Sequence, residues 1–163
     1  MKDLTTALNN IDMTYDQLVE MANDIVSKCT KQSDEVIKSI RNNIENLTND
    51  DIRVYMAKLS LTAYSFSEIK EKSTMKAECA EVLRKEAYAT EFGILDGSVA
   101  AKDNQATLNI SEEILTETMY NLVSSILKSK LDELHRVVDT LKTIIMSRLS
   151  EAKLTYIADN GQE

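Results

Sequence analysis

Apolar residues recur at steps of three and four through residues 4–47, which is the spacing of one face of a helix. They form two sets: Leu4, Ala7, Leu8, Ile11, Leu18, Ala22, Ile25, Val26 and Cys29, and then Val36, Ile37, Ile40, Ile44 and Leu47. Thr14 and Gln17 have the spacing of a capping box, and Ser33 is followed by two acids that suit the positive end of a helix. We therefore expect short helices that begin at Thr14 and Ser33, the second ending near Leu47.

A much longer helix is expected next. Residues 48–51 form a polar break that also suits a helix N-terminus. From there the apolar positions continue without a glycine as far as Gly93: Ile52, Met56, Leu59, Ala63, Phe66, Ile69, Ala77, Ala80, Leu83 and Ala87. A helix of about 40 residues is about 60 Å long. Because a compact domain of this size is narrower than that, the helix should pair with an element of similar length.

The sequence after residue 92 predicts a second long helix that could pair with the first. Residues 93–98 contain Gly93 and Gly97, two of the three glycines, and are expected to form a hinge. Ser98 and Ser111 are expected to begin the helices that follow. In the last helix, steps of four and three alternate as in the heptad seam of a coiled coil. The seam consists of Leu127, Leu131, Leu134, Val138, Leu141, Ile145 and Leu149, with Ala152 beyond them.

The fold class predicted from these patterns is all-α. It consists of short N-terminal helices in residues 1–48, a long antiparallel helical hairpin in 49–158 hinged at 93–98, and a frayed tail at 159–163. The arms should resemble a coiled coil and leave apolar surface for a homo-oligomer. The composition agrees, because the 163 residues include no proline and three glycines, too few turn residues for a β-rich fold.

Charge excludes one class of function. Lys and Arg number 19 against 27 Asp and Glu, a net charge of −8, so a strongly basic nucleic-acid-binding protein is excluded. The acidity is uneven, since residues 1–69 hold 7 basic and 11 acidic groups, and residues 93–123 hold 1 and 5. No leader or membrane-spanning run is present, so we expect a cytoplasmic protein of a bacterial host cell.

Residues for catalysis or metal binding are scarce. His135 is the only histidine, and Cys29 and Cys79 have no CxxC spacing, so a zinc site is not expected. No phosphate-binding loop, nucleophile elbow or metalloprotease motif occurs. We expect no enzyme activity, no cofactor, no metal and no small-molecule substrate.

The cations of the first long helix are the candidate nucleic-acid-binding residues. They are Lys70, Lys76, Arg84 and Lys85. Tyr64, Phe66 and Tyr88 lie nearby and could stack on bases. The alternative is an ordinary solvated face, because glutamates are interleaved with these cations. Lys128, Lys142 and Lys153 form a similar row on the last helix, and there too the alternative is the outside of a coiled coil.

Three stretches together, residues 55–64, 76–88 and 120–149, resemble small helical phage proteins of the recombination-mediator type, such as those of T-even phages. The shared order is a tyrosine-bearing long helix, a basic centre, a glycine break and a long amphipathic helix. The resemblance implies a non-enzymatic homo-oligomer that binds single-stranded DNA and helps a recombinase displace the single-strand-binding protein. It places strand binding at Arg84 and Lys85 and assembly at residues 127–149. This chain departs from that family by an N-terminal extension and a more acidic composition.

Two other functions stay open. An acidic helical phage protein could bind and inhibit a basic host protein, such as a defence or nucleic-acid-binding protein, because an acidic surface can occupy a basic groove. A purely structural assembly oligomer is the other. All three readings share self-association, and none involves a membrane.

Overall fold

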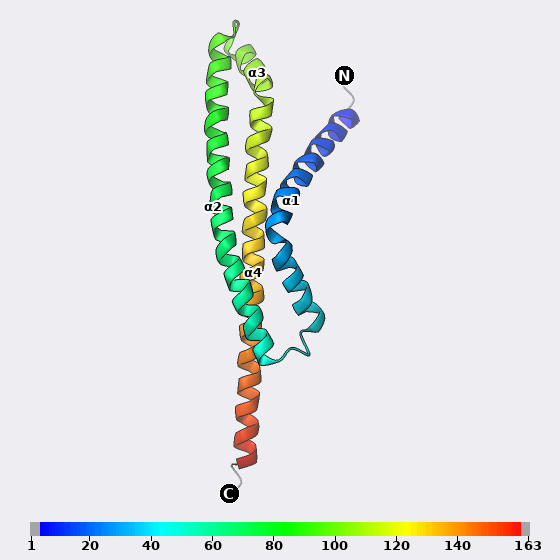
Figure 1. The fold of residues 1–163 in the computed structure, drawn as a ribbon. Helices are drawn as coiled ribbons and strands as arrows, with labels where there is room; N and C mark the ends of the chain where they lie inside the picture. Colours follow the sequence, from blue (N-terminus) through cyan, green and yellow to red (C-terminus); the bar gives the residue numbers. More distant parts are fainter. Residues whose placement is uncertain (1–3, 161–163) are drawn as a thin grey trace. The chain divides into compact units, whose positions relative to one another are not determined.

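Helices make up nearly all of the chain that the structure describes. The computed structural model describes the backbone of residues 4–160 and the side chains of residues 14–157. Within these residues the helices are α1 (Leu4–Asn43), α2 (Asn49–Ile94), α3 (Val99–Asn109) and α4 (Ser111–Asn160), and there is no strand (Figure 1). The predicted all-α class is confirmed. None of these helices is both long and apolar enough to cross a membrane.

The N-terminal region differs from the prediction, because α1 is one helix of 40 residues. Thr14 and Ser33 lie inside it and do not begin separate helices. No proline or glycine interrupts this stretch, and Ser33 satisfies its buried hydroxyl within the helix by donating to the Thr30 carbonyl at 2.7 Å. The side chains of the first predicted apolar set up to Ile11 lie outside the described residues.

The polar break at residues 48–51 does begin the long helix, as predicted. Asp51 N–H donates to the Thr48 hydroxyl oxygen at 3.1 Å, and Thr48 N–H donates back to Asp51 Oδ2 at 3.0 Å. This reciprocal pair is a capping box with Asp in place of Glu. The preceding helix ends at Asn43 and not near Leu47, since a turn follows in which Asn46 N–H donates to the Asn43 carbonyl at 2.9 Å.

The turn after α2 depends on Gly97. Its φ of 121° lies in the region that favours glycine, whereas Gly93 is still helical, in the last turn of α2. Ser98 caps α3 as predicted, its hydroxyl oxygen accepting from Ala101 N–H at 3.3 Å. Ile110 then ends α3, and its carbonyl accepts from Ile114 N–H at 3.1 Å, so α4 begins with hardly a break. The predicted frayed tail lies largely outside the described residues, although α4 includes Asp159 and Asn160.

The chain divides into two compact units. Unit 1 consists of Met1–Cys29 and Glu68–Lys128, and unit 2 of Thr30–Ser67 and Ser129–Glu163. Each unit therefore combines a part of α1, of α2 and of α4.

In unit 1, α2 and α4 lie side by side and antiparallel (Figure 1). Thr74 shares a hydrogen bond of 3.0 Å with Ser124, and Arg84 pairs with Glu117, so residue numbers rise on one helix as they fall on the other. This part of the predicted hairpin is thus observed. The core of the unit is a cluster of side chains from α1 and α4, with partly buried neighbours on α2 and α4: Ala22, Val26, Val123, Leu127, Ile69, Leu122 and Ile126.

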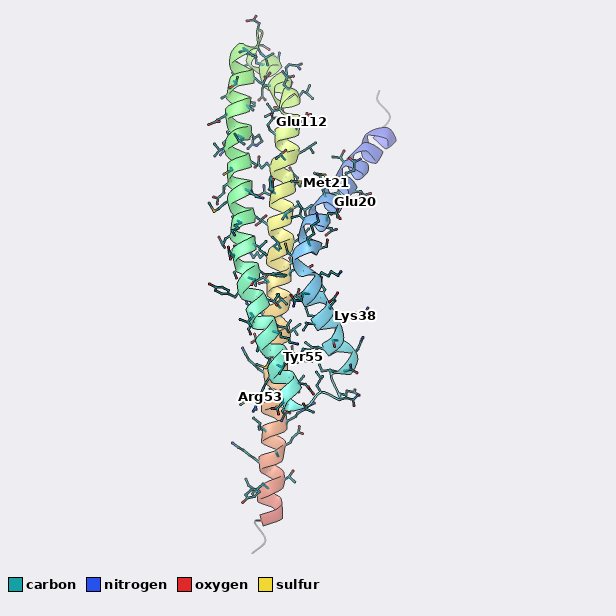
Figure 2. All side chains as sticks on the ribbon, in the orientation of Figure 1. Glu20, Met21, Lys38, Arg53, Tyr55 and Glu112 are labelled. Atoms are coloured by element: carbon teal, nitrogen blue, oxygen red, sulfur yellow. The ribbon has the colours of Figure 1, made fainter. Side chains whose placement is uncertain are left out.

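Unit 2 is held together by apolar packing and by polar links between its helices. Its buried side chains come from all three helices: Ile37, Ile40, Ile52, Leu59, Ala63, Phe66, Leu134, Val138 and Leu141. The hydroxyls of Ser39 and Tyr55 lie 3.3 Å apart and join α1 to α2 (Tyr55 is labelled in Figure 2). Arg148 on α4 donates to the Leu47 carbonyl at 2.6 Å and so fastens the loop between α1 and α2.

Candidate functional site

The four cations proposed to bind nucleic acid lie on α2 in unit 1, and each already has a partner. Lys70 Nζ is 2.8 Å from Glu71. Lys85 Nζ is 2.6 Å from Glu81, and this hydrogen bond, with the charge of Lys85, lowers the pKa of the Glu81 carboxyl. Glutamate partners on the same helix are what the interleaved charge pattern predicted as the alternative.

Arg84 is held by another helix. Its Nε donates to Oε2 of Glu117 on α4, and the two side chains are 29% and 19% exposed. Lys76 lies over the ring of Tyr120, with its Nζ 5.7 Å from the ring centroid. Three of the four predicted cations are therefore paired with carboxylates, and of these Lys85 is 63% exposed.

The aromatic side chains do not accompany these cations as a stacking platform. Phe66 is buried at 2% exposure in unit 2. Tyr88 stacks on Phe92 with ring centroids 5.8 Å apart and donates to Asp103 at 2.6 Å, a hydrogen bond that raises the pKa of the Tyr88 phenol. Tyr64 is 79% exposed, but it belongs to unit 2.

The predicted oligomer seam is largely occupied by the chain itself. Leu127, Leu134 and Leu141 are exposed by 1% or less, and Val138 by 7%. Leu131 and Ile145 are half-buried, and Leu149 is 43% exposed. Most seam residues therefore pack within their own chain, and an interface between copies would need other residues.

A second apolar surface, which the sequence analysis missed, lies on the outer face of α2. We call its exposed members the outer stripe. They are Val54, Leu61 and Tyr64 in unit 2 and Met75, Val82 and Leu83 in unit 1. Leu83 was expected on the packed face, but it is 61% exposed. The steps of seven and fourteen residues from Val54 through Leu61 and Met75 to Val82 are the sequence signal that could have revealed this face.

Unit 1 also contains a groove between its parts of α1, α2 and α4, with a volume of about 500 Å³. Its lining is mainly apolar and includes two lysines: Ile25, Cys29, Ile69, Lys72, Ser73, Met75, Lys76, Tyr120, Val123 and Leu127. Ser73 is 7% exposed, and its hydroxyl has no hydrogen-bond partner. No sequence pattern pointed to this groove, because its walls come from three segments far apart in the chain.

Two other grooves are smaller than this one. Met21 on α1, labelled in Figure 2, lines a smaller one with Leu115 and Met119 of α4. His135 is exposed and lines a groove in unit 2 with Tyr64 and Asp139. Across the part of the chain that the structure describes, no three His, Cys, Asp or Glu side chains are grouped as metal binding would require.

Comparison with known proteins adds no relative. Neither the family models nor the curated proteins nor the solved structures that were searched gave a match to this chain.

Proposed function

We propose that this protein is a non-enzymatic assembly protein that acts as a homo-oligomer, with copies joined through the outer stripe of α2. The observation that carries the proposal is the exposure of large apolar side chains on the side of α2 that faces away from the packed core. Leu61 is 71% exposed and Val82 is 54% exposed. Exposed large apolar side chains that recur on one face of a helix are typical of an interaction site.

The two faces of α2 are easiest to see in neighbouring leucines. Leu59 is 1% exposed and Leu61 is 71% exposed. Residues two positions apart point about 200° apart around a helix, so one leucine packs in the chain and the other faces solvent. Fully burying a side chain of this kind stabilises a complex by roughly 1.5–3 kcal/mol. Several such side chains within each unit therefore favour a helical partner, and the seven-residue spacing suits a second copy of the same helix.

The role in single-stranded DNA binding that the phage resemblance implies has less support from the geometry. DNA affinity depends on cations that can replace counterions along the phosphates. Here Lys70, Arg84 and Lys85 each face a carboxylate, on a chain of net charge −8. The hypothesis that the protein inhibits a host protein requires a basic partner. Its support is the uneven distribution of acidic residues along the sequence.

Light scattering after size exclusion tests the assembly role. The wild-type chain should elute as an oligomer at micromolar concentration, and Leu61→Glu and Val82→Glu should each shift it toward the monomer. Ser60→Glu is the matched control, because Ser60 is exposed next to Leu61 but lies to the side of the outer stripe. Circular dichroism should show unchanged helicity in all three variants. A wild-type monomer would refute the proposal.

The same samples can test the DNA role. A labelled single-stranded oligonucleotide should bind weakly or not at all at moderate salt. Strong binding that falls steeply with salt, and that Arg84→Ala together with Lys85→Ala removes, would favour the recombination-mediator reading instead.

A further inference from the structure

The groove of unit 1 is lined mainly by apolar side chains, which suit an apolar ligand. Ile25 of α1, Ile69 of α2, and Val123 and Leu127 of α4 line it from three helices. Its volume of about 500 Å³ is within the range of about 300–1,000 Å³ that is typical of small-ligand sites. A slender apolar chain would cover the exposed parts of Ile25 and Ile69, whereas Val123 and Leu127 are already buried.

The groove also contains a polar group that the protein leaves unsatisfied. The Ser73 hydroxyl is buried among the lining residues and has no hydrogen-bond partner. A buried polar group without a partner costs about 1–3 kcal/mol. The hydroxyl oxygen has almost no accessible surface, so a ligand oxygen that supplies the missing bond must displace a neighbouring side chain slightly.

The charge of the lining favours an anion. Two lysines and no carboxylate line the groove, although the chain as a whole has a net charge of −8. Lys72 is paired with Glu68 at 2.6 Å. Lys76 lies against the Tyr120 ring, and no carboxylate of the described residues comes within ion-pair distance of it.

Ser73 and Lys76 are one helical turn apart on α2. Side chains at this spacing are neighbours, with Cβ atoms about 5–6 Å apart, so the two oxygens of one carboxylate could accept from both. We infer that the groove binds an amphipathic carboxylate of the fatty-acid type. The carboxylate accepts hydrogen bonds from Ser73 Oγ and Lys76 Nζ, and the alkyl chain lies along Ile25 and Ile69. This ligand is bound and not transformed.

Titration calorimetry with dodecanoate, below its micelle concentration, tests the inference on the full-length chain. One equivalent should bind per chain, and dodecyltrimethylammonium, with the same tail and the opposite charge, should bind at least tenfold more weakly. Lys76→Gln should weaken dodecanoate binding about tenfold or more, since a hydrogen bond to a charged group is lost. Ser73→Ala should weaken it severalfold. Lys128→Gln is the matched control, removing the same charge from an exposed position of α4 in unit 1, and should leave the affinity unchanged.

Several results would overturn the inference. They are no binding of dodecanoate, equal binding of the cationic analogue, and an affinity unaffected by Lys76→Gln. A dodecanoate affinity that falls as the protein concentration rises would mean that a second copy fills the groove, and would also refute it. Circular dichroism of the Ser73 and Lys76 variants separates lost binding from lost folding. Because the outer-stripe variants change the oligomer mass and these variants should not, failure here leaves the assembly proposal standing.

Discussion

Arg84 on α2 donates from Nε to Oε2 of Glu117 on α4, and this ion pair joins two helices of unit 1 across 33 positions of sequence. Both side chains are partly withdrawn from water, at 29% and 19% exposure. The residue to which the phage resemblance assigned DNA binding therefore has a structural role. Removing its partner would leave a partly desolvated guanidinium without an anion, which is more costly than losing an exposed pair.

Glu117→Gln should lower the free energy of unfolding by about 1 kcal/mol, because the uncharged amide compensates Arg84 less well than the carboxylate does. Urea unfolding followed by circular dichroism measures the change. Glu81→Gln is the comparison, since its partner Lys85 is 63% exposed, and it should produce no measurable change. Equal effects of the two substitutions would mean that the link from Arg84 to Glu117 has no special role in stability.

Local sequence patterns were sufficient to predict where the helices with side-chain caps begin. Thr48 with Asp51, and Ser98, cap helices where predicted, because a cap depends on residues within one turn of each other. The same rules misled at Thr14 and Ser33. Both have the residues of a cap, yet nothing in α1 breaks the helix, and Ser33 satisfies its hydroxyl within it. Capping residues permit a helix start but do not impose one.

The candidate site was less predictable, because it depends on which helices meet. The helical spacing of Lys76 and Arg84 was known from the sequence, but Tyr120 and Glu117 reach them from α4. The seam of α4 was found correctly as an apolar face, although its burial within the same chain requires tertiary contacts. The outer stripe does not follow from assigning α2 a single apolar face, because α2 has a buried apolar face and an exposed one.

Leu127→Ala should lower the free energy of unfolding by about 3 kcal/mol, since truncating a buried leucine removes apolar contact and leaves a cavity. Leu127 is 1% exposed and packs with Val26 and Val123 in the core of unit 1. Urea unfolding gives the value. Leu149→Ala, at the far end of the same seam, should change stability much less, because Leu149 is 43% exposed. A larger loss for Leu149 would indicate that copies bury that end of the seam in solution.

Acid should weaken the start of α2 through Asp51. The Thr48 hydroxyl donates to Asp51 Oδ2 at 2.6 Å, and with the Thr48 backbone N–H it lowers the pKa of Asp51 below the ordinary 3.8. Unfolding breaks these bonds and restores the ordinary pKa, so the unfolded chain binds the proton more readily. The contribution of Asp51 to stability is therefore fully present above about pH 5 and is lost as the pH falls through the lower, folded pKa.

Asp51→Asn isolates this effect from the other carboxylates whose pKa values are also lowered, among them Asp139 beside Lys142. The variant should be less stable than the wild type at pH 7, and the difference should shrink as the pH falls through the folded pKa of Asp51, because its carboxylate then loses its charge. Urea unfolding at a series of pH values measures the difference. In a Thr48→Ala background the pH-dependent part should become smaller, because the hydroxyl that contributes most to the pKa shift is gone. A difference that stays constant from pH 7 to the acid limit would show that the charge of Asp51 does not stabilise the cap, since its ionisation is the only property of the pair that changes over that range.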